Sequence, residues 1–419
     1  MTSDNQEDGN AIEAQVQLLQ NTIAQWWNRV QSTELEQLGS SDVTILGNRF
    51  PLEEIYPVIN SRLWFTYRAG FEPIQKAEDG PSPLAFLKSM IFNVRPSMAL
   101  GGLFDNQNYS TDVGWGCMIR TSQSLLANAL QMLILGRDHQ SPQAIQSAPE
   151  KVEKIIQLFG DDYTCPFSLH NFIKVASALP LKVKPGEWFG PSAASLSIKR
   201  LCAKFESNEI PNINVSICES CNLYDEEIRG IFEESESPLL ILFPLRLGID
   251  KINSIYYPSL LQLLALKQSV GIAGGKPSSS YYFFGFQGSN LLYLDPHNLQ
   301  AASSDPGTYH TSKFQTLSIS NLDPSMLAGV LINDYDDYLD FKETVVKENK
   351  IIHFMENSRI LQPPTSDYRE DFVQVSSDPP DPDIDDFVEI NEPYVQDEER
   401  QITPDSVGLQ DMLGKYEVL

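Results

Sequence analysis

The spacing of apolar residues changes between the two halves of the chain. In the first half, apolar residues recur every three or four positions, which is typical of amphipathic helices. Ser192 precedes one of these patterns and is a suitable N-cap. The predicted helices are AIEAQVQLLQNTIAQWWNRV (11–30), TSQSLLANALQMLILG (121–136), SLHNFIKVASAL (168–179) and SAASLSIKRLCAKF (192–205).

The second half contains runs of aromatic and aliphatic residues separated by turn signals. Such runs predict adjacent central strands of a sheet, and the last two are close enough to form a hairpin. Helices followed by strands predict an α+β fold, with a helical N-terminal half packed on an antiparallel-rich sheet. The three predicted strand segments are PLLILFPLRLG (238–248), SYYFFGFQGSN (280–290) and LLYLDPH (291–297).

Charge divides the chain further. Its 419 residues carry a net charge of -26, which disfavours nucleic acid and anionic membrane surfaces as partners. Residues 366–419 hold sixteen Asp and Glu but three Lys and Arg. This composition predicts disorder. We therefore expect an N-terminal arm with a helix at 1–40, a globular domain at 41–360 and an acidic, disordered tail at 361–419.

Cysteine usage and hydropathy indicate the compartment. The five cysteines are scattered, which favours a reducing environment over a disulfide framework. The N-terminus MTSDNQEDGN does not resemble a signal peptide, and the apolar run at 238–245 is too short to span a bilayer. These features predict a cytoplasmic protein.

Cys117 is the first candidate for chemistry. It follows Trp-Gly and precedes a predicted helix, whose N-terminal N–H groups and dipole favour a thiolate. A buried cysteine that only fills space is an equally good interpretation of this residue alone. A nucleophile would also need a base.

His297 is the best candidate base among the five histidines. It lies two positions after Asp295 at the end of a predicted strand, and positions i and i+2 of an extended chain face the same way. A carboxylate beside an imidazole fixes its tautomer and stabilises the imidazolium. Asp-Pro-His is alternatively a simple turn with a solvated histidine. The dispersed histidines form no zinc motif, and we expect neither a metal nor a cofactor.

Five motifs in order give the chain a specific resemblance to a known family. It resembles the autophagins, the cysteine proteases of autophagy, which have a papain-like core. The resemblance runs from about Ser61 to Pro324. The motifs are SRLWFTYR (61–68), WGCMIR (115–120), GEWFGPS (186–192), GGKPSSSYYFFGF (274–286) and LYLDPH (292–297).

The resemblance implies an activity. Autophagins cleave the ubiquitin-like autophagy modifier after its C-terminal glycine and hydrolyse the amide that joins this glycine to phosphatidylethanolamine. The partners implied are the precursor and the lipid-conjugated modifier, with peripheral membrane contact through the latter. The implied location is cytoplasmic with recruitment to autophagosome assembly sites; a nuclear pool is left open.

The resemblance also assigns residues. The motifs imply Cys117 as nucleophile, His297 as base, Asp295 as its orienting carboxylate and Tyr67 as an oxyanion donor. Trp188 is implied to cover the cleft. The substrate loop implied by GGKP comprises Gly274, Gly275 and Pro277, and the two glycines suggest a flexible hinge before a proline-stiffened lid.

Short motifs in the tail and one cysteine pair remain. Aromatic-x-x-aliphatic segments can add a strand to the modifier. Two candidates are Phe387 with Ile390 and Tyr416 with Leu419, and FVQV at 372–375 also fits. Cys218 and Cys221 have the spacing of a redox motif, but a surface loop explains them without a second pair.

Two other functions stay open at the level of sequence. One is a scaffold that binds the modifier without hydrolysing it, and the other is a thiol hydrolase that acts on ubiquitin. Retention of Cys117, His297, Asp295 and Tyr67 speaks against the scaffold.

Overall fold

A computed structural model describes residues 39, 41–83, 107–137, 148–277 and 279–356. The strands are β1 Val43–Ile45, β2 Asn48–Phe50, β3 Arg68–Gln75, β4 Asn108–Thr111, β5 Asn214–Ile217, β6 Asn222–Tyr224, β7 Leu239–Arg246, β8 Ser269–Lys276, β9 Ser279–Gln287, β10 Asn290–Leu294, β11 Gln300–Ala301, β12 Gln315–Ser318, β13 Ser325–Ile332 and β14 His353–Met355. The α-helices are α2 Ile55–Asn60, α4 Cys117–Leu135, α6 Pro149–Gln157, α7 Leu169–Ala176, α8 Pro191–Cys202, α9 Asp225–Glu234, α10 Tyr257–Ala265 and α11 Tyr335–Val345.

The main sheet has the order β12-β10-β9-β8-β13-β7-β5, with β1 added beside β9 and β2 beside β1. Its pairings are antiparallel except for β5 with β7, so the α+β expectation is confirmed. The predicted hairpin is formed by β9 and β10, and Gly288 in its turn adopts φ +58°. The expectation that all three predicted strands are neighbours is wrong, because β8 and β13 separate β7 from β9.

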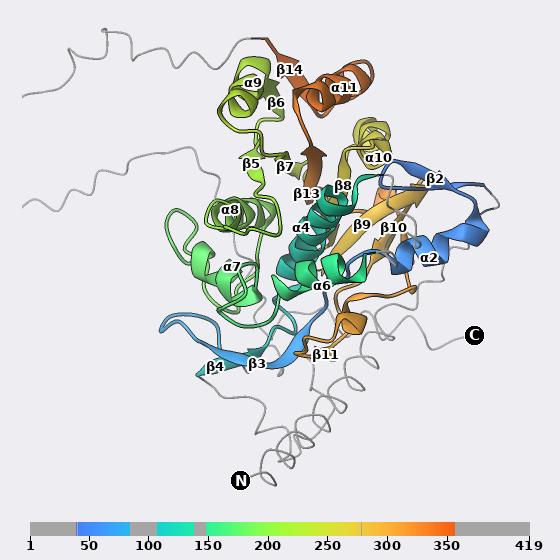
Figure 1. Cartoon of the computed structure of the whole chain (residues 1–419). Coiled ribbons are helices and arrows are strands. Elements are labelled where there is room, and N and C mark those ends of the chain that lie inside the picture. The colour runs from blue at the N-terminus through green and yellow to red at the C-terminus, as the bar shows by residue number, and fades with distance from the viewer. Residues whose placement is uncertain (1–38, 40, 84–106, 138–147, 278, 357–419) are drawn as a thin grey trace, which may run out of the picture. The chain divides into compact units, whose positions relative to one another are not determined.

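Both faces of this sheet are buried. Leu240 and Leu242 of β7 belong to a core shared with α4, α6, α7 and α8. The alternate residues Leu239, Ile241 and Phe243 belong to a second core, shared with α10 and α11. Burial on both faces explains why β7 is a continuous apolar run rather than an alternating one. Figure 1 shows α4 lying across the sheet, beside α6 and α8.

Buried polar side chains of α4 fix the chain segment at residues 61–67. Asn128 accepts a hydrogen bond from the Leu63 N–H (3.1 Å) and donates one to the Leu63 carbonyl (2.9 Å). Ser124 Oγ accepts from the Phe65 N–H at 3.1 Å. These bonds satisfy backbone groups that no sheet partner serves. The helix that begins at Cys117 therefore also holds the segment that leads to Tyr67.

One helix boundary differs from its prediction. Helix α8 has Gly190 as its N-cap and Pro191 as its first residue, so Ser192 is not the cap. Proline suits this first position because its missing N–H would have no partner there. The predicted N-terminal helix and the acidic tail lie outside the described residues. Among the helices that the structure describes, none is long and apolar enough to cross a membrane.

Candidate active site

Cys117 is the first residue of α4 and is fully buried (0% exposed). Within the described residues, no side chain caps this helix, whose N-cap is Gly116. The first-turn N–H groups therefore present partial positive charge at the thiol. A side chain at position 116 would displace the Asp112 carboxylate, because a Cβ there would lie 2.4 Å from Asp112 Oδ2.

Asp295 and His297 follow directly after β10. His297 Nδ1 and Asp295 Oδ1 are 2.5 Å apart, and the same oxygen accepts a hydrogen bond from the His297 N–H at 2.9 Å. The segment is a turn, so the expected extended geometry is wrong. The pairing itself is confirmed, because the carboxylate bonds the imidazole from within that turn. His297 is buried (5% exposed) rather than solvated.

Aromatic side chains hold the imidazole in place. Tyr67 and Tyr281 meet the His297 ring edge-on, with ring centroids 5.2 and 5.5 Å away. The Tyr67 N–H donates to the Pro296 carbonyl at 2.8 Å, and Trp64 Nε1 donates to the Asp295 carbonyl at 2.8 Å. The segment at 64–67 is thus bonded to the turn that carries His297.

Cys117, His297 and Tyr67 meet although about 180 positions separate the first two. The Cys117 sulfur contributes to raising the pKa of His297 and the pKa of Tyr67, so the three side chains are close enough to interact. The Gly114 backbone acts in the opposite direction and lowers the pKa of Tyr67. This is the meeting of sulfur and imidazole that the sequence motifs required.

The electrostatics favour a protonated His297. Burial disfavours the imidazolium, but the charge and hydrogen bond of Asp295, together with Cys117, outweigh it and raise the pKa of His297 to about 9. Burial, followed by the charges of Cys117 and Asp112, raises the pKa of Tyr67 well above its ordinary value. At neutral pH the site thus holds an imidazolium beside the sulfur and a neutral phenol able to donate a hydrogen bond.

A pocket of about 270 Å³ includes the residue that follows Cys117 in the chain. Met118, the residue after the cysteine, lines it together with Trp188, Gly274 and Gly275. Trp188 is half exposed (45%), which is unusual for a large aromatic side chain within a pocket wall. Trp188 therefore lies at the pocket wall and not in either buried core.

The predicted glycine hinge is not a loop. Gly274 and Gly275 belong to β8 and pair with Tyr281 and Ser280 of β9, while the exposed Pro277 lies in the turn between the two strands. A Cβ at position 275 would lie 2.1 Å from the Ser279 carbonyl oxygen. Here glycine permits close approach of strands rather than hinge motion.

The remaining histidines and cysteines have structural partners or lie apart. His170 Nε2 bonds the Glu72 carbonyl (2.6 Å) and His310 Nδ1 bonds the Asn60 carbonyl (2.9 Å). Cys218 is buried with its Sγ at 3.3 Å from the Asn222 carbonyl, in the loop between β5 and β6. His139 and the tail motifs (Phe387, Ile390, Tyr416 and Leu419) lie outside the described residues. In the part of the chain that the structure describes, no group of three potential metal ligands occurs.

Three residues around the site were missed from sequence. They are Trp64, Asp112 and Tyr281, which contact the Asp295 carbonyl, the start of α4 and the His297 ring. Trp64 and Tyr281 lie within motifs that also carry a predicted site residue. Asp112 lies shortly before the motif that contains Cys117. That proximity was the available signal, but their partners are distant in sequence and no local pattern specifies them.

Comparison with known proteins agrees with this geometry. The Peptidase C54 catalytic domain matches residues 52–344. A probable cysteine protease ATG4 of Debaryomyces hansenii is 51% identical over 80% of this chain and 71% of its own length. Its counterpart in Meyerozyma guilliermondii is 48% identical over 84% of both chains. The cysteine protease ATG4 of Candida albicans is 44% identical over 88% of this chain and 81% of its own. This chain therefore belongs to the peptidase C54 family, the autophagins, and is a cysteine-type protease of autophagy.

Proposed function

We propose that the chain cleaves the ubiquitin-like autophagy modifier after its C-terminal glycine and hydrolyses the amide between that glycine and phosphatidylethanolamine. The observation that carries this proposal is the convergence of Cys117, His297 and Asp295, with Met118, the residue after the cysteine, lining a pocket that Trp188 also lines. Both reactions pass the same glycyl group to water, so one site serves both.

The first step is acylation of Cys117. The proton of the Cys117 thiol resides on His297 when the sulfur attacks the glycine carbonyl, and the carbon–nitrogen bond breaks as His297 gives that proton to the leaving nitrogen. That nitrogen belongs to the next residue of the precursor or to the ethanolamine of the lipid. Tyr67 and the N–H groups at the start of α4 stabilise the negative oxygen that forms on the way.

The second step is hydrolysis of the thioester. His297, now neutral, takes a proton from water, the resulting hydroxide attacks the carbonyl, and the carbon–sulfur bond breaks. The products are the modifier with a free glycine carboxylate and the regenerated Cys117. Asp295 keeps Nδ1 of His297 protonated, so Nε2 can exchange protons in both steps.

We infer that the walls of this pocket select glycine. Trp188, Gly274 and Gly275 line the same pocket, and Pro277 lies in the turn after β8. A side chain on the scissile residue would collide with these walls. Steric exclusion discriminates more strongly than an apolar pocket that only rewards fit.

The decisive experiment offers the purified chain three substrates side by side. These are the modifier precursor, the modifier coupled to phosphatidylethanolamine in vesicles, and ubiquitin with a C-terminal extension. Cleavage of the first two alone supports the proposal. Cleavage of ubiquitin would favour the other thiol hydrolase, and binding of the modifier without cleavage would favour the scaffold.

A pH profile tests the acid role of His297. Its imidazolium exists below the raised pKa and is lost above it, so kcat/KM should fall as pH rises through about 9. Asp295→Asn removes a charge that raises this pKa. The falling limb should therefore move to lower pH, as measured by initial rates in constant ionic strength. An unchanged limb in Asp295→Asn would contradict the assignment.

We also propose that the tail docks the modifier. Phe387 with Ile390, or Tyr416 with Leu419, would add an edge strand and fill two apolar pockets, and the acidic flank would meet a basic surface. Charge supports the first motif, because Asp383, Asp385 and Asp386 precede it.

Deleting residues 380–419 is expected to weaken binding of the modifier by about tenfold, because one linked docking segment is lost. Isothermal titration with a Cys117→Ala chain measures this without turnover. A matched control replaces the four aromatic and aliphatic positions by alanine and keeps the charges. Unchanged affinity in both variants would remove the tail proposal.

The proposed organisation keeps a protease domain at 41–360 between an arm at 1–40 and a tail at 361–419. The described helices and strands run from Val43 to Met355, which supports these boundaries. The proposed location is the cytoplasm, with recruitment to autophagosome assembly sites through the lipidated substrate.

A further inference from the structure

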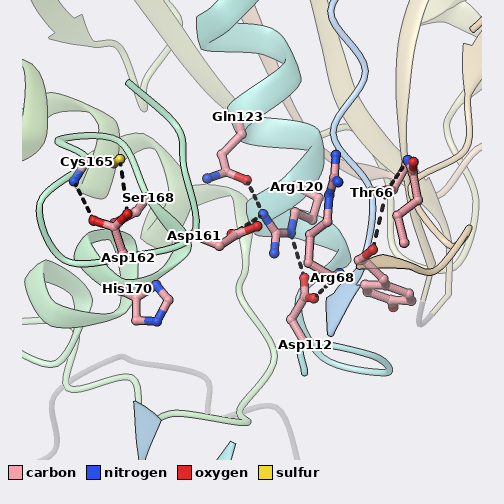
Figure 2. A network of polar contacts seen from close by, with 12 residues as sticks. Thr66, Arg68, Asp112, Arg120, Gln123, Asp161, Asp162, Cys165, Ser168 and His170 are labelled. Atoms are coloured by element: carbon pink, nitrogen blue, oxygen red, sulfur yellow. Dashed lines mark hydrogen bonds and ion pairs between the residues drawn. The ribbon is translucent and has the colours of Figure 1, made fainter. Parts of the chain in front are cut away.

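A buried polar network joins the residues next to Tyr67 and Cys117 in the chain, with Arg68, Asp112 and Arg120 at its centre (Figure 2). Asp112 is fully buried and precedes Cys117 by five residues. Both oxygens of this carboxylate accept hydrogen bonds. Oδ1 accepts from the Arg68 N–H at 2.7 Å, and Oδ2 accepts from Arg120 Nε at 2.7 Å.

These two bonds reach the two elements that carry the reacting groups. Arg68 follows Tyr67 in the chain, and Arg120 lies one turn after Cys117 on α4. One rigid carboxylate thus connects the backbone beside the hydroxyl to the helix that presents the sulfur. Figure 2 shows the Arg120 side chain and the backbone of Arg68 bonded to Asp112, while the Arg68 side chain points away from it.

The backbone of Asp112 makes a third connection. Its carbonyl accepts hydrogen bonds from the N–H groups of Trp115 (3.2 Å) and Gly116 (2.9 Å), which closes the turn before α4. Gly114 in that turn adopts φ +88°, and its backbone is close enough to Tyr67 to lower the pKa of the phenol. The turn closed by Asp112 is therefore adjacent to the Tyr67 side chain.

We propose that Asp112 is a positioning residue that holds the Tyr67 hydroxyl at the oxyanion side of Cys117. The proposal deepens the proposed function, since it rests on Cys117 as nucleophile and Tyr67 as oxyanion donor. Asp112 does not touch the reacting atoms and acts through Tyr67. Its buried charge also helps to keep the phenol protonated, because it raises the pKa of Tyr67.

Asp112→Asn tests this role. An amide has a single acceptor oxygen, so one of the two bonds, to Arg68 or to Arg120, must be lost while the side-chain volume stays the same. Acyl transfer should slow by about tenfold, because small displacements of a stabilising donor are costly. Alkylation of the Cys117 sulfur by iodoacetamide forms no oxyanion, so it should proceed at the wild-type rate.

Two small reagents separate these effects without the physiological substrate. Acylation of Cys117 by p-nitrophenyl acetate uses the oxyanion donors, whereas alkylation by iodoacetamide does not. The Cys117→Ala chain supplies the background from the other cysteines. The modifier precursor is assayed in parallel, so failure of the proposed function shows only there and leaves the acylation result intact.

A double-mutant cycle with Tyr67→Phe shows whether Asp112 positions the Tyr67 hydroxyl or only stabilises the fold. In the Tyr67→Phe background, Asp112→Asn should slow acylation by less than twofold, because the hydroxyl that it positions is already gone. Equal tenfold losses in both backgrounds would overturn the proposal, as would a parallel loss of alkylation.

Asp161→Asn is the matched control. Asp161 is also buried and bonds the other end of Arg120, with its Oδ1 at 2.8 Å from the arginine NH1 group, but it has no bond to the segment of Tyr67. It should lower thermal stability as Asp112→Asn does and show no coupling to Tyr67→Phe. Coupling as large as that of Asp112 would overturn the proposal.

A second variant keeps the test intact if Asp112→Asn fails to fold. Gly116→Ala displaces the carboxylate sterically and leaves its charge in place, because the new Cβ would lie 2.4 Å from Asp112 Oδ2. It should slow acylation more than alkylation and couple to Tyr67→Phe in the same direction. Additive losses would count against the proposal.

Discussion

Replacing Cys117 with alanine is expected to lower the rate of modifier cleavage by more than about 10⁴-fold, while the affinity for the precursor stays within about threefold. Loss of a nucleophile removes the covalent route entirely, and losses of this size are measured when such a residue is deleted. Binding survives because the sulfur is fully buried at the start of α4 and offers little surface to a protein partner. Mass spectrometry of the precursor and titration calorimetry measure the two quantities.

Cys202→Ala is the matched control for this substitution. Cys202 is a second buried cysteine, at the end of α8, and burial raises the pKa of its thiol to about 12. It therefore remains a neutral thiol, and its replacement should leave turnover unchanged. Normal cleavage by the Cys117→Ala chain would exclude Cys117 as nucleophile, and loss of cleavage in Cys202→Ala would show that the assay follows stability instead.

Features of the fold that depend on neighbouring residues could be predicted from sequence. The apolar pattern after Cys117 predicted α4, and the turn at Gly288 between two aromatic runs predicted the β9–β10 hairpin. In both elements the interactions that select the structure lie within a few positions. The cap of α8 was missed because Pro191 competes with Ser192 for the start of the helix.

The order of strands could not be predicted in the same way. Strand β13 inserts between β7 and β8, although it follows both in the chain. The strands that pair with β13 are determined by packing in two cores on opposite faces of the sheet. This packing depends on segments that are distant in the chain, so local hydropathy does not predict it. The same holds for Asn128 of α4, whose polar side chain serves the backbone of Leu63.

The candidate site combines both kinds of information. Asp295 and His297 are close in sequence, so their pairing could be predicted, yet the turn that brings them together belonged to the alternative in which the histidine is solvated. The family resemblance alone supplied Tyr67 and Trp188. Neither source identified Asp112, because its role depends on Arg68 and Arg120 meeting around one carboxylate.

Replacing His297 with alanine should reduce cleavage nearly as much as loss of Cys117, by about 10³-fold or more. The imidazole serves both chemical steps, as the acid for the leaving nitrogen and as the base for water, and it stabilises the sulfur anion between them. The effects of residues that act as one catalytic unit are not additive, so the double Cys117→Ala and His297→Ala chain should be no slower than Cys117→Ala alone.

Asp295→Ala should retain more activity than His297→Ala, because the imidazole remains and loses only its orienting partner. The exposed His353 of β14 offers a control whose alanine variant should cleave at the normal rate. Precursor cleavage under single-turnover conditions measures all four variants, and a His297→Ala chain within tenfold of the wild-type rate would show that another group performs the proton transfers.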